Sequence, residues 1–216
     1  EMALRGGADI VLGLPVSFSV CSANRFAMGS VSIMKKIGVS AISFGIEQES
    51  AEVLPKAAII LGDENDSFRT LFAEKMSQGY SYAKARSYAL SQQLHVDDML
   101  LHRPNTILAL AYMSADIQTG KTLSYFPVVR QVSHHAEEDL LSSDSSIYAS
   151  STAIRNAFEL NGSISDIIPF VPASTVCILQ KAIDSRRFHR KRALDLLLRW
   201  NLRNEKPFPG MHNASE

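Results

Sequence analysis

Cysteine is scarce in this sequence of 216 residues, which contains only Cys21 and Cys177, far apart along the chain. Two such cysteines make neither a C-x-x-C pair nor a disulfide framework, so we expect both to be reduced, buried thiols in a cytoplasmic protein. No apolar run approaches the length of a membrane span, and no signal-peptide pattern opens the chain. These absences exclude a disulfide scaffold and favour a protein without a membrane partner.

An excess charge of one sign is also missing, because 22 Lys and Arg side chains balance 22 Asp and Glu side chains. Overall neutrality neither favours nor excludes nucleic acid as a partner, so the distribution of charge has to decide. A hydrophobic share of 46% suits one ordinary core with an appendage. It excludes disordered and collagen-like classes.

The first part of the chain alternates apolar runs with amphipathic stretches. Residues 10–14 form an apolar run bounded by Gly and Pro, which predicts a buried parallel strand. Residues 26–37 predict a helix stopped by Gly38, and residues 39–44 predict the next strand. Strand, helix and strand joined by short turns form a βαβ unit, so the pattern predicts an α/β fold with a parallel sheet.

Residues 50–100 differ from the preceding residues because they show helical patterns only, and they predict a helical insertion lying against the sheet. Asp66 or Ser67 is expected to cap one helix, and Ser81 another. The later apolar patterns predict further elements in this order: a helix at 106–117, a strand at 123–129, and helices at 176–183 and 193–202.

A run of three hydroxyl residues, Ser150, Ser151 and Thr152, is typical of a helix start. Free backbone N–H groups at such a start can bind an anion, and Arg155 falls on the same helical face as Ser151 and Thr152. The run predicts a polyphosphate site held by amides and by charge. The same run is also typical of an ordinary helix cap.

Several short motifs follow one another in a characteristic order. They are residues 7–16, Ser22-Ala23 with Phe26-Ala27-Met28-Gly29, residues 38–40 leading to Phe44-Gly45-Ile46-Glu47, Arg103-Pro104-Asn105, Arg130-Gln131, and the Ser-Ser-Thr-Ala-Ile-Arg stretch at 150–155. In this order they resemble the tRNA(Met) cytidine acetate ligase family of the nucleotidyltransferase-like superfamily, whose founding motif is His-x-Gly-His.

The resemblance implies a Rossmann-like nucleotidyltransferase core with a helical insertion at about 50–100. It implies an ATP-binding domain at 1–165 that is incomplete at its N-terminus, a basic helical region at 166–203 and a loose tail at 204–216. The first strand of this superfamily is central. Without it, we expect residues 10–14 and 123–129 to pair directly or to leave a gap.

The resemblance also implies a nucleotide site at the carboxyl ends of the strands. The residues carried over to ATP binding are Gly45, Asn105, Arg130, Gln131, Ser151, Thr152 and Arg155. Simpler interpretations are a turn glycine at Gly45, a helix N-cap at Asn105 and a surface ion pair at Arg130. Ordinary geometry thus explains each residue separately, and only the resemblance joins them.

The activity implied is ATP-dependent formation of acetyl-adenylate from acetate, followed by acetylation of the wobble cytidine of elongator tRNA(Met). Mg²⁺ is expected to accompany ATP. His134 and His135 do not predict a metal site, because adjacent side chains point apart on an extended chain. His135 is a further candidate for the nucleotide site, since the family has a His after the Arg strand.

One basic run stands out between residues 186 and 203, which contain seven Lys and Arg residues and a single acidic residue, Asp195. Such a run can follow an RNA backbone, although a solvated helix face has the same composition. Within the resemblance, the residues expected to bind tRNA are Arg186, Arg187, Arg190, Lys191 and Arg192.

The chain departs from the family in one important respect, because none of its six histidines stands in a His-x-Gly-His pattern. Catalytic residues are therefore not assigned, and we expect a fragment or a degenerate relative that is inactive by itself. Two alternatives stay open. One is a nucleotidyltransferase acting on a small phosphate ester, and the other is a non-catalytic nucleotide- or RNA-binding protein.

Overall fold

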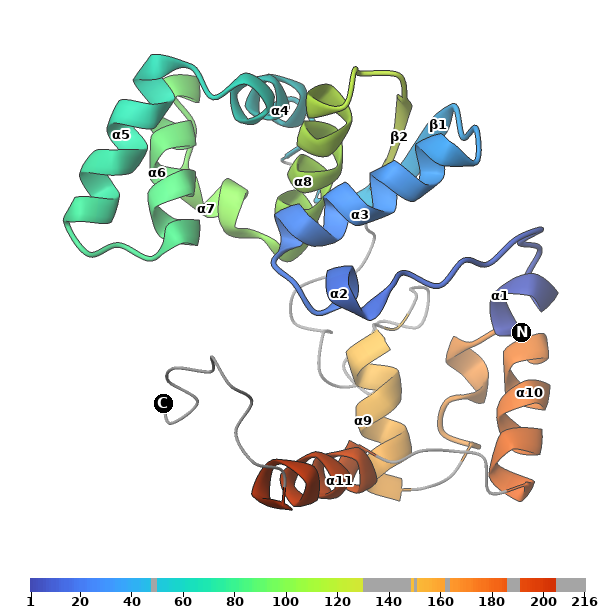
Figure 1. Cartoon of the computed structure of the whole chain (residues 1–216). Helices are drawn as coiled ribbons and strands as arrows, with labels where there is room; N and C mark the ends of the chain where they lie inside the picture. The colour runs from blue at the N-terminus through green and yellow to red at the C-terminus, as the bar shows by residue number, and fades with distance from the viewer. Residues whose placement is uncertain (48–49, 130–148, 150, 162–163, 186–190, 205–216) are drawn as a thin grey trace. The chain divides into compact units, whose positions relative to one another are not determined.

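The computed structural model describes residues 1–47, 50–129, 149, 151–161, 164–185 and 191–204. The chain forms two compact units (Figure 1). Residues 12–130 make up the first, called the sheet unit here, and residues 1–11 with 131–216 make up the second, called the helical unit. The domain boundary predicted after residue 165 stays a prediction.

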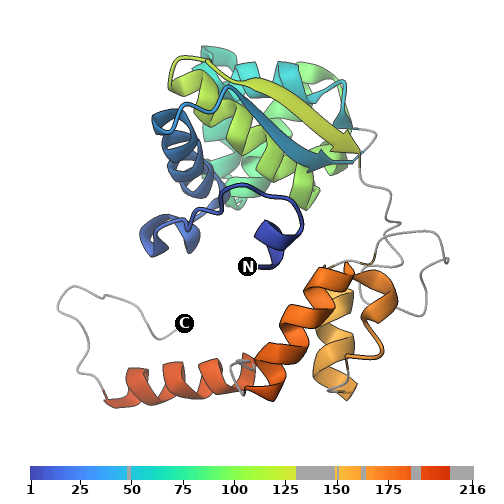
Figure 2. The same cartoon turned by 90° about the vertical axis from the view of Figure 1, so that its right-hand side faces the viewer.

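The sheet unit contains two parallel strands with helices packed behind them (Figure 2). β1 (Ala41–Ile46) pairs with β2 (Ser124–Val129) in a register that sets Ala41 opposite Ser124 and Ile46 opposite Val129. Parallel strands need a long crossover, which here is helical. The helices of this unit are α2 (Val16–Ser19), α3 (Ala23–Lys36), α4 (Leu54–Asp63), α5 (Asp66–Ser77), α6 (Tyr82–Leu94), α7 (Asp98–His102) and α8 (Pro104–Gln118). The predicted α/β class with a parallel sheet is confirmed.

The turn from α3 into β1 follows the sequence closely. Gly38 ends the helix with a φ of +81°, a conformation that suits a residue without Cβ. Ala27 and Val31 are fully buried in one core cluster with Ile42 of β1. The helix predicted at 26–37 is confirmed, and the strand predicted at 39–44 lies two residues further along the chain.

The helical insertion predicted for residues 50–100 corresponds to α4, α5, α6 and α7. Its apolar faces share one core with α8 and the end of β1, in which Leu90 of α6 and Leu110 of α8 are each 1% exposed. Ser81 caps α6, as predicted. The N-cap predicted for α5 at Asp66 or Ser67 is wrong by one or two residues, because Asn65 is the N-cap and accepts the hydrogen bond from Phe68 N at 2.8 Å.

The strand predicted at residues 10–14 is absent. Ile10 is 71% exposed and Leu12 is 53% exposed, and no described residue pairs with this run as a strand. Of the two outcomes expected for residues 10–14 and 123–129, direct pairing is wrong, since β2 pairs with β1 instead, and the gap stays a prediction. Apolar side chains alone do not make a strand, because its backbone groups also need a hydrogen-bonding neighbour.

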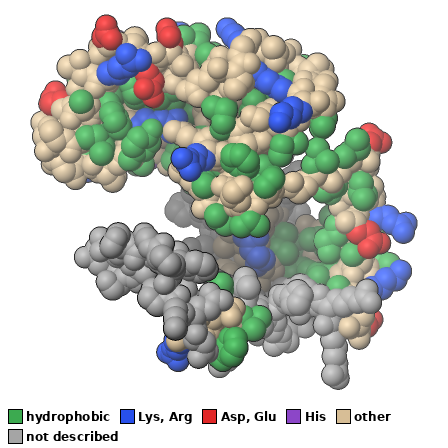
Figure 3. Space-filling view, in the orientation of Figure 1, with side chains coloured by type: hydrophobic (Ala, Val, Ile, Leu, Met, Phe, Trp, Pro, Cys, Tyr) green, Lys and Arg blue, Asp and Glu red, His purple; other side chains and the backbone are tan. Residues whose placement is uncertain are grey.

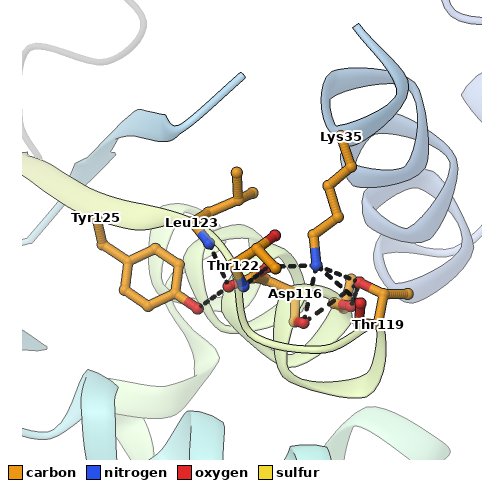
Figure 4. Close-up of polar contacts among 7 residues, drawn as sticks. Lys35, Asp116, Thr119, Thr122, Leu123 and Tyr125 are labelled. Atoms are coloured by element: carbon orange, nitrogen blue, oxygen red, sulfur yellow. Dashed lines mark hydrogen bonds and ion pairs between the residues drawn. The ribbon is translucent and has the colours of Figure 1, made fainter. Parts of the chain in front are cut away.

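A buried ionic cluster joins α3, α8 and the start of β2 (Figure 4). The carboxylate of Asp116 is fully buried and lies 2.6 Å from Lys35 Nζ, while Tyr125 donates its hydroxyl to Asp116 Oδ2 at 2.6 Å. The backbone N–H groups of Thr122 and Leu123 also donate to this carboxylate. Burial opposes ionisation of Asp116, but these partners outweigh it and lower the pKa of the carboxyl.

The helical unit has a smaller core. It consists of α1 (Met2–Arg5), α9 (Ser151–Asn161), the 3₁₀ turn η4 (Ile168–Phe170), α10 (Ala173–Asp184) and α11 (Lys191–Asn204). Ala153 of α9 and Ile167 are each 1% exposed and form the centre of its apolar cluster. Both helices predicted after residue 170 are confirmed.

Both cysteines are free thiols. Cys21 is partly buried and donates its thiol to Ser17 O at 3.1 Å. Cys177 is exposed, so its predicted burial is wrong. The helical period explains this, because Val176, Leu179 and Ile183 of α10 face the core and Cys177 falls outside their stripe.

Candidate functional site

Two of the predicted ATP-binding residues, Gly45 and Asn105, belong to the sheet unit, near the carboxyl end of β1. Gly45 lies inside β1 opposite Val128, one residue before the strand ends at Ile46. It is exposed, whereas Ile42 and Ile46 face the core. Gly45 is therefore not a turn glycine, and its simpler interpretation is wrong. Its bare backbone lies on the open face of the sheet, where a flat ligand can approach.

Glu47 follows β1 directly and forms the centre of a buried polar cluster that sequence reasoning missed. It is 7% exposed. Asn105 donates from Nδ2 to Glu47 Oε1 at 2.8 Å, and Thr106 donates from Oγ1 to Glu47 Oε2 at 2.8 Å. Since the single hydroxyl hydrogen of Thr106 is used there, Ser50 donates to Thr106 Oγ1 at 2.8 Å. The cluster ties the end of β1 to the start of α8.

The carboxyl of Glu47 is held in its ionised form. Burial is the largest influence on its pKa and raises it. The hydrogen bonds from Asn105 and Thr106, with the positive charge of Arg103, outweigh that effect and lower the pKa below its ordinary value. At neutral pH the cluster therefore presents a fixed carboxylate that orients the Asn105 amide.

Asn105 does not cap α8, so the N-cap interpretation is wrong. Pro104 takes the first position of the helix and Arg103 the N-cap position, which leaves Asn105 in the first turn. Its NH₂ group is committed to Glu47, and no described residue donates to its Oδ1. The amide oxygen is thus oriented and available to accept a hydrogen bond, for example from an amino group of a base.

The hydroxyl run at the start of α9 has the predicted local geometry. α9 begins at Ser151, and Arg155 Nη2 donates to Thr152 Oγ1 at 3.3 Å. Ser151, Thr152 and Arg155 are exposed, while Ala153 is buried in the helical unit. This group and the Gly45–Asn105 group belong to different units, so their convergence in one cleft stays a prediction.

Several predicted residues lie outside the described residues. They are Arg130 and Gln131, which directly follow β2, together with Ser150, His134, His135, Arg186, Arg187 and Arg190. Lys191 and Arg192 open α11. In the view of Figure 3, the Lys and Arg side chains of the sheet unit are scattered among acidic and apolar ones. This face of the sheet unit offers no continuous basic patch.

Two further features were sought in the part of the chain that the structure describes. No three His, Cys, Asp or Glu side chains gather there as a metal site. No helix there combines the length and apolarity needed to cross a membrane.

Comparison with known proteins places these features in context. The sequence profile of the HIGH Nucleotidyl Transferase family matches residues 1–213. The tRNA(Met) cytidine acetate ligase of Bacillus mycoides is 36% identical over 185 residues, which is 83% of this chain and 46% of that protein. The enzyme of the same name from Thermosipho africanus is 34% identical over 191 residues, or 87% of this chain and 44% of that protein. The chain thus spans less than half the length of these curated relatives.

Two solved structures of a protein from Thermotoga maritima have a fold similar to that of this chain. The crystal structure of apo TmcAL from Thermotoga maritima superposes with a TM-score of 0.74 at 29% identity, over 85% of this chain and 44% of that one. The same protein bound with alpha-thio ATP gives a TM-score of 0.72 at 28% identity, over 85% of this chain and 42% of that one. The fold described above is therefore similar to one that binds an ATP analogue.

Proposed function

Because this chain belongs to the HIGH nucleotidyl transferase family, we propose that it forms the nucleotide-binding part of an ATP-dependent tRNA(Met) cytidine acetate ligase. The observation that carries the proposal is the cluster at the carboxyl end of the sheet. There, ionised Glu47 fixes the amide of Asn105, and both lie beyond the strand that exposes Gly45. Ligands of open parallel sheets bind at this end.

The proposed residues divide by the part of ATP that they hold. Gly45 offers bare backbone to the base or ribose, and the free Oδ1 of Asn105 accepts from an amino group. Thr152 and Arg155, with Ser151, offer hydroxyl and guanidinium groups to phosphates. Arg130 and Gln131 complete the phosphate contacts in this proposal. Mg²⁺ would enter with the phosphates of ATP, to which this ion usually binds, and would neutralise part of their charge.

The proposed reaction has two group-transfer steps. A carboxylate oxygen of acetate attacks the α-phosphorus of ATP, and the bond to the departing pyrophosphate breaks, which gives acetyl-adenylate. The exocyclic amine of the tRNA wobble cytidine then attacks the acetyl carbon, loses a proton and releases AMP. No covalent enzyme nucleophile is needed, because positioning and charge stabilisation suffice for both steps. Arg186, Arg187, Arg190, Lys191 and Arg192 are proposed to hold the tRNA backbone.

ATP affinity of an Asn105→Ala variant tests the nucleotide site. Losing one hydrogen bond to the ligand should weaken ATP binding roughly tenfold in isothermal titration. Gln118→Ala is the matched control, because it removes an exposed amide from the other end of the same helix. Equal ATP affinities in both variants and in the parent chain would overturn the site.

A second candidate function is favoured by one observation, namely that the six histidines include no His-x-Gly-His pattern. Without those preorganised donors, the chain binds ATP and RNA but does not turn them over. We expect the 216-residue chain to show no acetate-dependent exchange of labelled pyrophosphate into ATP. Exchange at the rate of a relative containing the motif would show that its absence is tolerated.

A further inference from the structure

Arg86 is a buried cation on the inner face of α6. It is only 9% exposed, and neither Nε nor Nη2 has a hydrogen-bond partner among the described residues. No described carboxylate forms an ion pair with it. Burial is the largest influence on the pKa of its guanidinium and lowers it, while the charges of Tyr82 and then Glu64 act in the opposite direction. Arginine stays protonated at neutral pH nonetheless, and a buried charge is costly unless it is paired.

Arg86 forms part of the wall of a cavity of about 240 Å³ between α3, α6, α7 and α8. Leu90, Leu101 and Leu110 line it and are otherwise almost completely buried. Among the described residues that line this cavity, Arg86 is the one charged side chain. The space therefore combines apolar walls with a single positive charge.

The start of α3 faces the same cavity. Ser22 occupies the N-cap position of this 14-residue helix, and its side chain makes no capping hydrogen bond. Ser22, Ala23 and Asn24 all line the cavity. The N–H groups of a first helical turn carry a partial positive charge that favours anions. Two independent features thus attract a negative group to one place.

The chemistry of the cavity selects the kind of anion. A planar carboxylate matches the guanidinium fork, and one negative charge balances one arginine. A polyphosphate would bring several charges against apolar walls with a single cation to compensate them. An aliphatic tail, in contrast, gains from contact with the leucine side chains. A small acid with one carboxylate and a short apolar tail satisfies all of these conditions.

We propose that this cavity binds a short-chain monocarboxylate, whose oxygens are held by the Arg86 guanidinium beside the first turn of α3. Nε and Nη2 are enclosed in the present geometry, so the proposal requires the guanidinium to turn toward the cavity that its side chain already lines. A second cavity of about 200 Å³ also borders Arg86, and Glu64 is among the residues that line it. The assignment of this cavity to the acid that the ligase activates rests on the proposed function. Binding of a monocarboxylate in the cavity does not depend on it.

Acetate and propionate are the probes, titrated into the 216-residue chain at constant ionic strength against chloride. At about 100 times its dissociation constant, the bound acid should raise the melting temperature by about 5 °C. Line broadening of ¹³C-labelled acetate provides a second, direct readout. A shift with inorganic phosphate but not with acetate or propionate would overturn the monocarboxylate assignment.

Arg86→Met provides the decisive variant, because it keeps the bulk of the side chain and removes its charge. Without acetate, its melting temperature should equal or exceed that of the parent, since an unpaired buried charge has been removed. The acetate-dependent shift should disappear. A variant that melts lower without acetate and keeps the full acetate shift would show that Arg86 is structural and that acetate binds without it, which overturns the proposal.

Arg69→Met is the matched control, because Arg69 is an exposed arginine on the neighbouring helix α5. It should keep the acetate shift. ATP affinity measured in the same samples separates the two proposals. Intact ATP binding without any acetate effect removes the cavity assignment alone, while an Arg86-dependent acetate effect without ATP binding removes the nucleotide site and leaves the cavity.

Discussion

Asn105 Nδ2 lies 2.8 Å from Glu47 Oε1, and this hydrogen bond joins the end of β1 to the first turn of α8. The two residues are 58 positions apart in the chain. An ionised carboxylate can only accept hydrogen bonds, so it forces the NH₂ group of Asn105 to face inward. The amide oxygen then faces away from Glu47. Glu47 is thereby a positioning residue for the proposed nucleotide contact.

Replacing Glu47 with Gln tests this positioning role. The Gln amide keeps the shape of Glu but offers one acceptor in place of two, so Asn105 or Thr106 loses its partner. We expect the free energy of unfolding to fall by about 1–3 kcal/mol in urea titrations. ATP affinity should fall as well, because Asn105 is free to flip. Glu52→Gln, at an exposed position nearby, should change neither quantity. Unchanged ATP affinity in Glu47→Gln would contradict the positioning role.

Local signals in the sequence predicted the local structure well. Gly38 and Ser81 end and begin helices where the sequence placed these events, because a positive φ and a capping hydroxyl depend on immediate neighbours. The face shared by Thr152 and Arg155 follows from the helical period in the same way. Such features need no knowledge of the rest of the fold.

Long-range features were harder to predict. Whether residues 10–14 form a strand depends on a neighbouring strand, which the described residues do not supply. Glu47 carried a usable signal, because a charged residue three positions after the strand predicted at 39–44 falls near the ligand-binding edge of the sheet. Arg86 carried none, since its burial results from the packing of α6 against distant helices.

Asp116→Asn tests the ionic cluster that Asp116 forms with Lys35 and Tyr125 at the start of β2. The substitution keeps the size of the side chain but leaves Lys35 without its counter-ion. Removing one partner of a buried pair costs about 3–5 kcal/mol, and we expect the low end because the Lys35 side chain is 17% exposed. Urea titration measures this loss. Asp66→Asn, at a fully exposed carboxylate, should cost far less. A loss no larger than that of the control would show that the cluster does not stabilise the fold.

Acidic pH should destabilise the chain by protonating the carboxyl groups of Asp116 and Glu47. The pKa values of Asp116 and Glu47 are both lowered on folding, so their stabilising contribution is complete above their unfolded pKa values of about 4. It is lost as the pH falls through the lower folded values. The free energy of unfolding should therefore change little between about pH 6 and 5 and decline below about pH 4. Asp116→Asn should show a shallower decline, and an identical slope would rule out Asp116 as a contributor.

Arg190→Ala combined with Lys191→Ala should weaken tRNA binding and leave ATP affinity unchanged. Each phosphate contact that is lost releases about one counter-ion fewer, so the slope of log K against log salt should become shallower by about one unit per contact. Filter binding over a salt series measures that slope. Lys56→Ala combined with Arg69→Ala removes two exposed cations from α4 and α5 and serves as the control. If both double variants show the slope of the parent chain, the basic run is a solvated surface and tRNA binds elsewhere.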